Sequence, residues 1–232
     1  MKGKLYLIPN IIAEGTQSEV LTPQVLAVVK EVKIFLAEDV RTARRFLSSL
    51  KISVEPLSFH VLNKDTKDVE IPELMRPLME GHDVGVISES GCPGVADPGA
   101  MAVAYAHAND LRVIPLVGPS SLLLALMASG LSGQQFVFHG YLPIEAKGAA
   151  DALRAMEKES KKKDQTQIFI ETPYRNNQLF ELMLKTLQKT TLLTVAIDIT
   201  GKEEAIRTQT VGKWLSSKTK WPKQPAVFLF RA

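Results

Sequence analysis

The sequence predicts an α/β protein of two domains, with a parallel sheet in the N-terminal half and a mixed sheet in the C-terminal half. Strand-like and helix-like segments alternate over the first half, a pattern typical of a parallel sheet with helices on both faces. Strand-like segments follow each other closely near the C-terminus, which favours antiparallel pairing. The 232 residues, of which 45% are apolar and 23% charged, suit a globular chain of one large or two small domains.

In the first half, short apolar runs bounded by turn-forming residues predict the strands. Thr22 with Pro23, and Asp39, are typical starts of helices, and Gly81 is a typical residue to follow the end of one. The expected strands cover residues 4–8, 33–37, 54–59, 83–88 and 111–116, and the expected helices cover 23–32, 40–50, 69–80 and 98–108.

In the second half, a helix is expected to open at Ser120 and Ser121, and the domain boundary falls between Gly118 and Gln134. We therefore expect an N-terminal domain over 1–118, a C-terminal domain over 119–232 and a cleft between them. Further strands are expected at 135–139, 167–171, 192–200, 205–210 and 226–231, and further helices at 146–163, 173–186 and 211–217.

Composition excludes several classes of protein. The net charge of +3 is too small to indicate a nucleic-acid-binding protein by itself. The single cysteine, Cys92, excludes a disulfide framework and a multi-cysteine zinc site, and we expect no metal. The first residues lack the apolar region of a signal peptide, and no apolar run approaches the roughly 18 residues of a membrane span. We therefore expect a cytoplasmic protein without membrane contact.

The common phosphate-binding and hydrolase motifs are missing from the sequence. None of the 14 glycines forms a Gly-x-Gly pair, so the dinucleotide fingerprint is excluded. The chain also lacks a Walker A sequence, a Gly-x-Ser-x-Gly elbow and a His-Glu-x-x-His pair. An α/β protein without these motifs must hold its ligand in another way.

Three polar loops follow predicted strands, at 88–99, 118–121 and 170–173. Ligands of open α/β sheets bind beyond the carboxyl ends of the strands, so these loops are candidates for a binding site. Glu89 and Asp97 are suited to receive a cation or ribose hydroxyls. Asp97 is also expected to cap the next helix, with Pro98 as its first residue.

Seven segments carry a family resemblance, in family order and over nearly the whole chain: 36–41, His60 with Asn63, 88–99, 113–121, 128–131, 138–143 and 168–175. On these segments the chain resembles the tetrapyrrole (corrin/porphyrin) methylase superfamily, and within it the branch of ribosomal RNA small subunit methyltransferase I. The resemblance implies a homodimeric methyltransferase that binds S-adenosylmethionine, releases S-adenosylhomocysteine and methylates a ribose 2′-hydroxyl of ribosomal RNA. RNA or a ribosomal subunit is then the expected partner.

By position, the resemblance implies a donor pocket lined by residues of both domains, many of them through backbone groups. These residues are Pro9, Ser90, Gly91, Val95, Ser120, Ser121, Tyr141, Glu171 and Ala226.

A hydroxyl acceptor must lose its proton, and the candidate catalytic residues for this are Asp39, His60 and Glu89. The candidate substrate-binding residues are Arg41, Asn63, Tyr174 and Arg175, with Arg44 and Arg45 as further phosphate contacts. Each has a structural alternative, such as a helix cap or a solvated helix face.

Two other functions stay open. The family's first loop usually reads Thr-Pro-Ile-Gly-Asn-Leu but is Ile-Pro-Asn-Ile-Ile-Ala at 8–13, and the chain ends at Ala232, before a C-terminal segment that longer members carry. These departures leave room for a methyltransferase acting on a tetrapyrrole or another small acceptor. They also leave room for a donor-binding protein without catalysis.

Overall fold

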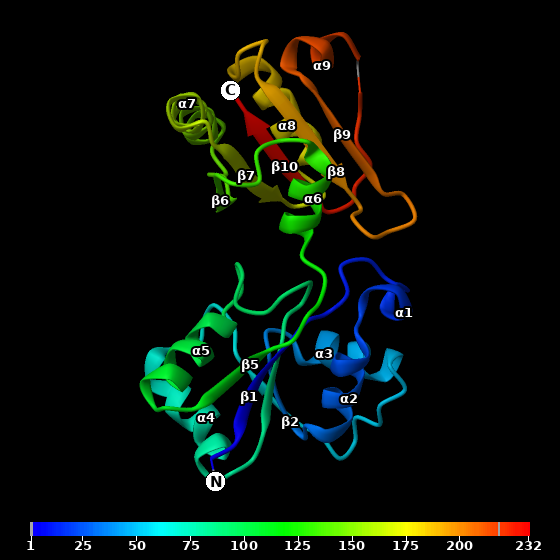
Figure 1. Ribbon diagram of the computed structural model, residues 1–232, viewed down its shortest axis with the longest axis vertical. Coiled ribbons are helices and arrows are strands. Elements are labelled where there is room, and N and C mark those ends of the chain that lie inside the picture. Colours follow the sequence, from blue (N-terminus) through cyan, green and yellow to red (C-terminus); the bar gives the residue numbers. More distant parts are fainter. Residues whose placement is uncertain (1, 218) are drawn as a thin grey trace. The chain divides into compact units, whose positions relative to one another are not determined.

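The computed structural model describes residues 2–217 and 219–232 and divides the chain into two compact units, Met1–Ser120 and Ser121–Ala232. Each unit contains one five-stranded sheet and its own helices (Figure 1). The predicted α/β class, with a parallel sheet followed by a mixed sheet, is confirmed. The cleft expected between the domains stays a prediction.

The first sheet is entirely parallel, in the strand order β3-β2-β4-β1-β5. Its helices follow the strands in alternation, as the sequence predicts. The strands are β1 (Lys4–Ile8), β2 (Ile34–Ala37), β3 (Ser58–Val61), β4 (Val84–Ile87) and β5 (Arg112–Pro115). The helices are α1 (Gln17–Val20), α2 (Pro23–Glu31), α3 (Val40–Ser49), the 3-10 turn η1 (Asp68–Glu70), α4 (Ile71–Met79) and α5 (Gly99–Ala108).

Two apolar clusters, one on each face, hold this sheet. Helices α2 and α3 bury side chains such as Val29 and Leu47 against Phe35 on one face, and α4 and α5 bury Met75 and Ala106 on the other. Figure 1 shows these helix pairs on opposite sides of the strands. Because both faces are covered, the free positions for a ligand lie at the strand ends and in the loops beyond them.

Two predictions for the first unit need correction, and one short helix was not predicted. The strand expected at 54–59 is wrong, because residues 55–56 form a turn that includes Pro56, which has no amide hydrogen, and β3 starts only at Ser58. The short helix α1 was not expected. Helix α5 begins at Gly99 with Pro98 as its N-cap, so Asp97 is not the cap residue, although its Oδ1 accepts the Gly99 amide at 2.7 Å.

The second sheet is mixed, in the order β6-β7-β10-β8-β9, with β6 and β7 parallel and the other pairs antiparallel. The helix expected from 173 begins only at 176, after a turn. The strands are β6 (Phe136–Tyr141), β7 (Thr166–Glu171), β8 (Leu192–Ile197), β9 (Ala205–Thr210) and β10 (Ala226–Arg231). The helices are α6 (Ser121–Ser129), α7 (Ala146–Lys163), α8 (Asn176–Thr186) and α9 (Val211–Ser217).

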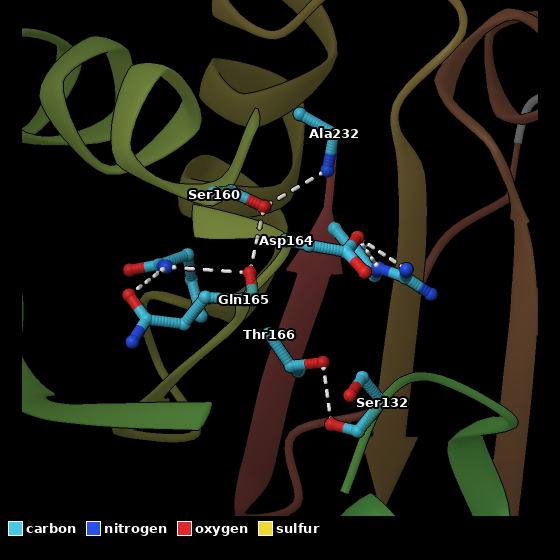
Figure 2. A network of polar contacts seen from close by, with 8 residues as sticks. Ser132, Ser160, Asp164, Gln165, Thr166 and Ala232 are labelled. Carbon is cyan, nitrogen blue, oxygen red and sulfur yellow. Dashed lines mark hydrogen bonds and ion pairs between the residues drawn. The ribbon is translucent and has the colours of Figure 1, made fainter. Parts of the chain in front are cut away.

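Hydrogen bonds and an ion pair hold the last residues of the chain against the end of α7 (Figure 2). The buried Ser160 hydroxyl donates to the Gln165 carbonyl at 2.7 Å and accepts the Ala232 amide at 3.0 Å. Asp164, which caps α7 in the left-handed conformation, forms an ion pair with Arg231. These contacts fix β10 in the centre of the sheet, where it pairs with both β7 and β8.

Candidate active site

The carboxyl ends of four strands meet at one edge of the first sheet. Ile87 at the end of β4 is the register partner of both Ile8 in β1 and Ala37 in β2, and Leu7 is the partner of Pro115 in β5. The loops that follow these strands therefore leave from the same edge. This is the edge at which open α/β sheets bind ligands.

Hydrogen bonds join these loops into one framework, largely through Asn10. Its backbone amide donates to the Gly91 carbonyl at 2.9 Å, and its buried side-chain amide donates to the carbonyls of Ser88 at 3.0 Å and Glu89 at 3.1 Å. Sequence reasoning did not include Asn10 among the site residues. The available signal was its position directly after a strand and Pro9, where an asparagine side chain often bonds to nearby backbone.

Glycines allow the loops to approach each other closely. A Cβ atom on Gly118 would lie 2.2 Å from both Cβ and Cγ of Pro9, which is shorter than any van der Waals contact. Gly91 adopts a φ of +70°, and a Cβ there would lie 3.2 Å from the Pro119 carbonyl oxygen. The Cys92 thiol donates to that same oxygen at 3.3 Å. Side chains in place of these two glycines would separate the loops.

All the donor-binding residues expected in the first unit lie in this framework. They differ in exposure: Pro9 and Gly91 are buried, Ser90 is exposed and Val95 exposes 51% of its surface. Ser120 is partly buried and ends the unit. A ligand bound here would therefore meet backbone groups of the buried residues and the apolar side chain of Val95.

In the second unit, three more of the expected residues lie on adjacent strands at one edge. Ala226 is the register partner of Glu171, and Tyr141 pairs with the preceding Ile170. Tyr141 is 60% exposed whereas Ala226 is 4% exposed, so Ala226 offers mainly its backbone. Ser121 is the first residue of α6, a helix that packs against the sheet through Ala125 and Leu126. The part that these four residues play in donor binding stays a prediction.

Glu171 is held by an ion pair and two hydrogen bonds. Its side chain is 1% exposed, and Oε2 lies 3.4 Å from Nη1 of Arg175. Oε1 accepts the amide and the hydroxyl of Thr172, at 2.7 and 3.2 Å. Tyr174 is 83% exposed, with the Lys223 ammonium 5.6 Å from its ring centroid. Of the two residues expected to bind substrate here, Tyr174 is therefore exposed while Arg175 is engaged within the fold.

Two consecutive carboxylates after β2 have opposite environments. The Asp39 side chain caps α3 by accepting the Thr42 amide at 2.9 Å, and this bond, with Arg41 and Arg45 nearby, lowers the pKa of Asp39. Burial, followed by the charges of Asp97 and Glu89, raises the pKa of Glu38. Sequence reasoning did not select Glu38. Its position beside Asp39 was visible in the sequence, but its partial burial was not.

The remaining expected residues lie near the outer strand β3. His60 is exposed and pairs in register with Leu36, one residue before the strand ends. Asn63 accepts the Asp65 amide at 2.9 Å through its side chain and thereby shapes the turn after β3. Arg41 is exposed in the first turn of α3. Their catalytic and substrate-binding roles stay predictions.

Comparison with known proteins identifies the family. The family of Tetrapyrrole (Corrin/Porphyrin) Methylases matches residues 15–214. This chain belongs to that family. It is a methyltransferase and takes its methyl group from S-adenosylmethionine.

Among curated proteins, this family member is similar to two that are named Ribosomal RNA small subunit methyltransferase I. The protein from Escherichia coli is 31% identical over 223 residues, which cover 96% of this chain and 73% of that protein. The protein from Buchnera aphidicola is 30% identical over 204 residues, which cover 88% of this chain and 69% of that protein.

Solved structures show the same fold at lower identity. The methyltransferase CobJ has a TM-score of 0.63 and 18% identity, with 99% of this chain and 94% of that chain covered. A uroporphyrin-III-C-methyltransferase from Thermus thermophilus has a TM-score of 0.57 and 18% identity, with 100% and 93% covered.

The residues at the first sheet's edge fit the methyl donor. The donor carries a methyl group on a positively charged sulfur, so the protein needs to position it rather than activate it. Glu89 and Asp97, whose charges both act on Glu38, provide negative charge at this edge, and the exposed Val95 provides apolar surface. The glycine-containing loops allow a ligand to approach their backbone closely.

Among residues 2–217 and 219–232 no cluster of metal-binding side chains occurs, and no helix is long and apolar enough to cross a membrane.

Proposed function

We propose that this methyltransferase methylates ribosomal RNA of the small subunit, at a ribose 2′-hydroxyl. The observation that carries the proposal is the similarity, over 88% to 96% of the chain, to two proteins named for that RNA. The choice of a ribose 2′-hydroxyl as the acceptor rests on the resemblance of the sequence to the ribosomal RNA small subunit methyltransferase I branch. A tetrapyrrole acceptor, which the family name suggests, is the competing outcome.

A basic helix supports the choice of an RNA substrate. Helix α3 carries Arg41, Arg44 and Arg45, and all three are exposed. Among the described residues none of the three forms an ion pair, in contrast to Arg76 and Arg154. The Arg44 guanidinium lies 5.1 Å from the ring centroid of Phe59, which holds it in place. Unpaired arginines on one helix are suited to contact phosphates.

The test offers three acceptors to the purified protein with isotopically labelled donor: small ribosomal subunits, large subunits and a uroporphyrinogen. The expected result is label in one ribose-methylated nucleoside of the small-subunit RNA, identified by mass spectrometry after digestion. Label on a base, or only on the tetrapyrrole, would contradict the proposal.

The contribution of α3 is tested by the salt dependence of RNA binding. Each phosphate contact with single-stranded RNA contributes about 0.7 to the slope of log affinity against log salt. Changing Arg41 and Arg45 to alanine should therefore lower the slope by roughly 1.4 if each contacts one phosphate. The control is Arg154→Ala, in an exposed pair with Asp151, which should leave the slope unchanged. An unchanged slope in the α3 variant would exclude the helix as a phosphate-binding surface.

We also propose that the protein acts as a homodimer, as the family resemblance implies. Sedimentation equilibrium should give twice the chain mass of 25.6 kDa. A mass equal to one chain at micromolar concentration would contradict this.

A further inference from the structure

Glu38 lies at the edge of the first sheet, beside the loop that follows β4, which we call the β4 loop. Ala37, which ends β2, is the register partner of Ile87 in β4, so Glu38 lies next to Ser88 and close to Glu89. On its other side β2 pairs with β3, and just beyond the end of β3 the Leu62 amide donates to the Ala37 carbonyl at 2.9 Å. This position is at the ligand-binding edge, on the side of the β4 loop away from β1 and β5.

Glu38 is a half-buried carboxylate at this edge that no contact within the described part of the fold occupies, so it can interact with a ligand. Within residues 2–217 and 219–232 its side chain makes no hydrogen bond or ion pair. By contrast, Asp39 caps α3, and Asp97 accepts the amides of Gly94 at 3.0 Å and Gly99 at 2.7 Å. The carboxylates of Asp39 and Asp97 therefore have structural roles.

The surroundings of Glu38 make it a stronger base than its neighbour. Its partial burial and the charges of Asp97 and Glu89 raise its pKa, whereas backbone amides and two arginines lower that of Asp39. A pair of carboxylates with opposite shifts is a typical sign of separate roles in acid–base catalysis. A base is most effective when its pKa approaches the working pH.

We propose that Glu38 accepts the proton of the acceptor hydroxyl during methyl transfer, in place of Asp39, His60 or Glu89. The inference rests on the proposed function, because only a hydroxyl acceptor has such a proton to lose. Glu38 takes the proton while the hydroxyl oxygen bonds to the transferred methyl carbon. The electron pair of the broken carbon–sulfur bond stays on sulfur, and the proton later leaves Glu38 for water.

The first test compares Glu38→Gln with Glu73→Gln, a matched change of an exposed glutamate in α4 that pairs with Arg76. General-base catalysis contributes about 10²- to 10⁴-fold, so Glu38→Gln should lower the transfer rate by at least 10²-fold. Its affinity for S-adenosylmethionine, measured by calorimetry, should stay close to that of the wild type, because a general base contacts the acceptor hydroxyl rather than the donor. Transfer by Glu38→Gln within threefold of the wild type would overturn the assignment.

A second readout does not depend on activity. In protein labelled with carbon-13, the Glu38 carboxyl should titrate above the ordinary glutamate value of about 4.3, and its midpoint should fall in Glu89→Gln. The transfer rate should decrease as the pH falls through that midpoint, because protonated Glu38 accepts no proton. A midpoint at or below the ordinary value, unchanged in Glu89→Gln, would overturn the assignment. A wild-type enzyme that methylates no ribose would instead overturn the proposed function, and the role of Glu38 with it.

Discussion

Replacement of Arg175 by alanine should destabilise the second unit far more than the loss of an ordinary surface ion pair. The Glu171 side chain, 1% exposed, would keep its two hydrogen bonds from Thr172 but lose the guanidinium 3.4 Å from Oε2. Removing one member of a buried ion pair costs about 3–5 kcal/mol. Because 27% of the Arg175 side chain is exposed and water screens part of the interaction, we expect about 2–3 kcal/mol.

Scanning calorimetry of the full chain measures this effect. With a shift of roughly 4 °C per kcal/mol for a unit of this size, the second unit should melt about 8–12 °C lower in Arg175→Ala. The control is Arg154→Ala in the same unit, whose pair with Asp151 is 61% and 62% exposed and should contribute at most about 1 kcal/mol.

A double variant tests the cause of the loss. Glu171→Gln in the Arg175→Ala background removes the unpaired buried charge and should recover part of the melting temperature. If Arg175→Ala melts no lower than Arg154→Ala, or if the double variant melts lower still, the account of Glu171 as a buried, paired carboxylate is wrong.

Three further predictions concern the loops, a helix cap and the C-terminus. Gly118→Ala should lower both stability and donor affinity, because its Cβ would meet Pro9 at 2.2 Å, and unchanged melting and calorimetric titrations would refute this. Asp39→Ala should melt at a lower temperature than the wild type at pH 7. The difference in melting temperature should close as the pH falls below about 4, because the lowered pKa of Asp39 stabilises the fold only while the group is ionised. A difference in melting temperature that does not depend on pH would contradict the role of Asp39 as a helix cap. Ser160→Ala should cost about 1–3 kcal/mol in urea unfolding, because the Gln165 carbonyl and the Ala232 amide lose their partner, and a cost below about 0.5 kcal/mol would contradict the network in Figure 2.

Most elements of the fold were predictable because their signals are local. Thr22 and Asp39 accept amides at the starts of α2 and α3, as N-caps do, and α7 has the predicted bounds. The strand predicted at 54–59 was misplaced because a turn at Pro56 separates the apolar residues on which the prediction rested. The position of β3 is set instead by its pairing with β2, which is distant in the sequence. Pairing over long sequence distances cannot be read from one segment.

The site was predictable in its loops but not in its electrostatics. Glycines, prolines and hydroxyl side chains after strands indicated the loops that the structure joins at one edge. The role of Asn10 in linking them, and the partial burial of Glu38 beside Glu89 and Asp97, depend on contacts between residues about 50 to 80 positions apart. Composition and spacing carry no information on such contacts.

The most direct test of the central account is a calorimetric titration of the whole chain with S-adenosylmethionine and S-adenosylhomocysteine. The loops at the edge of the first sheet predict saturable binding of each at one site per chain, weakened in Gly118→Ala. An absence of saturable binding, both for the protein alone and with small ribosomal subunits present, would contradict the assignment of these loops as the donor site.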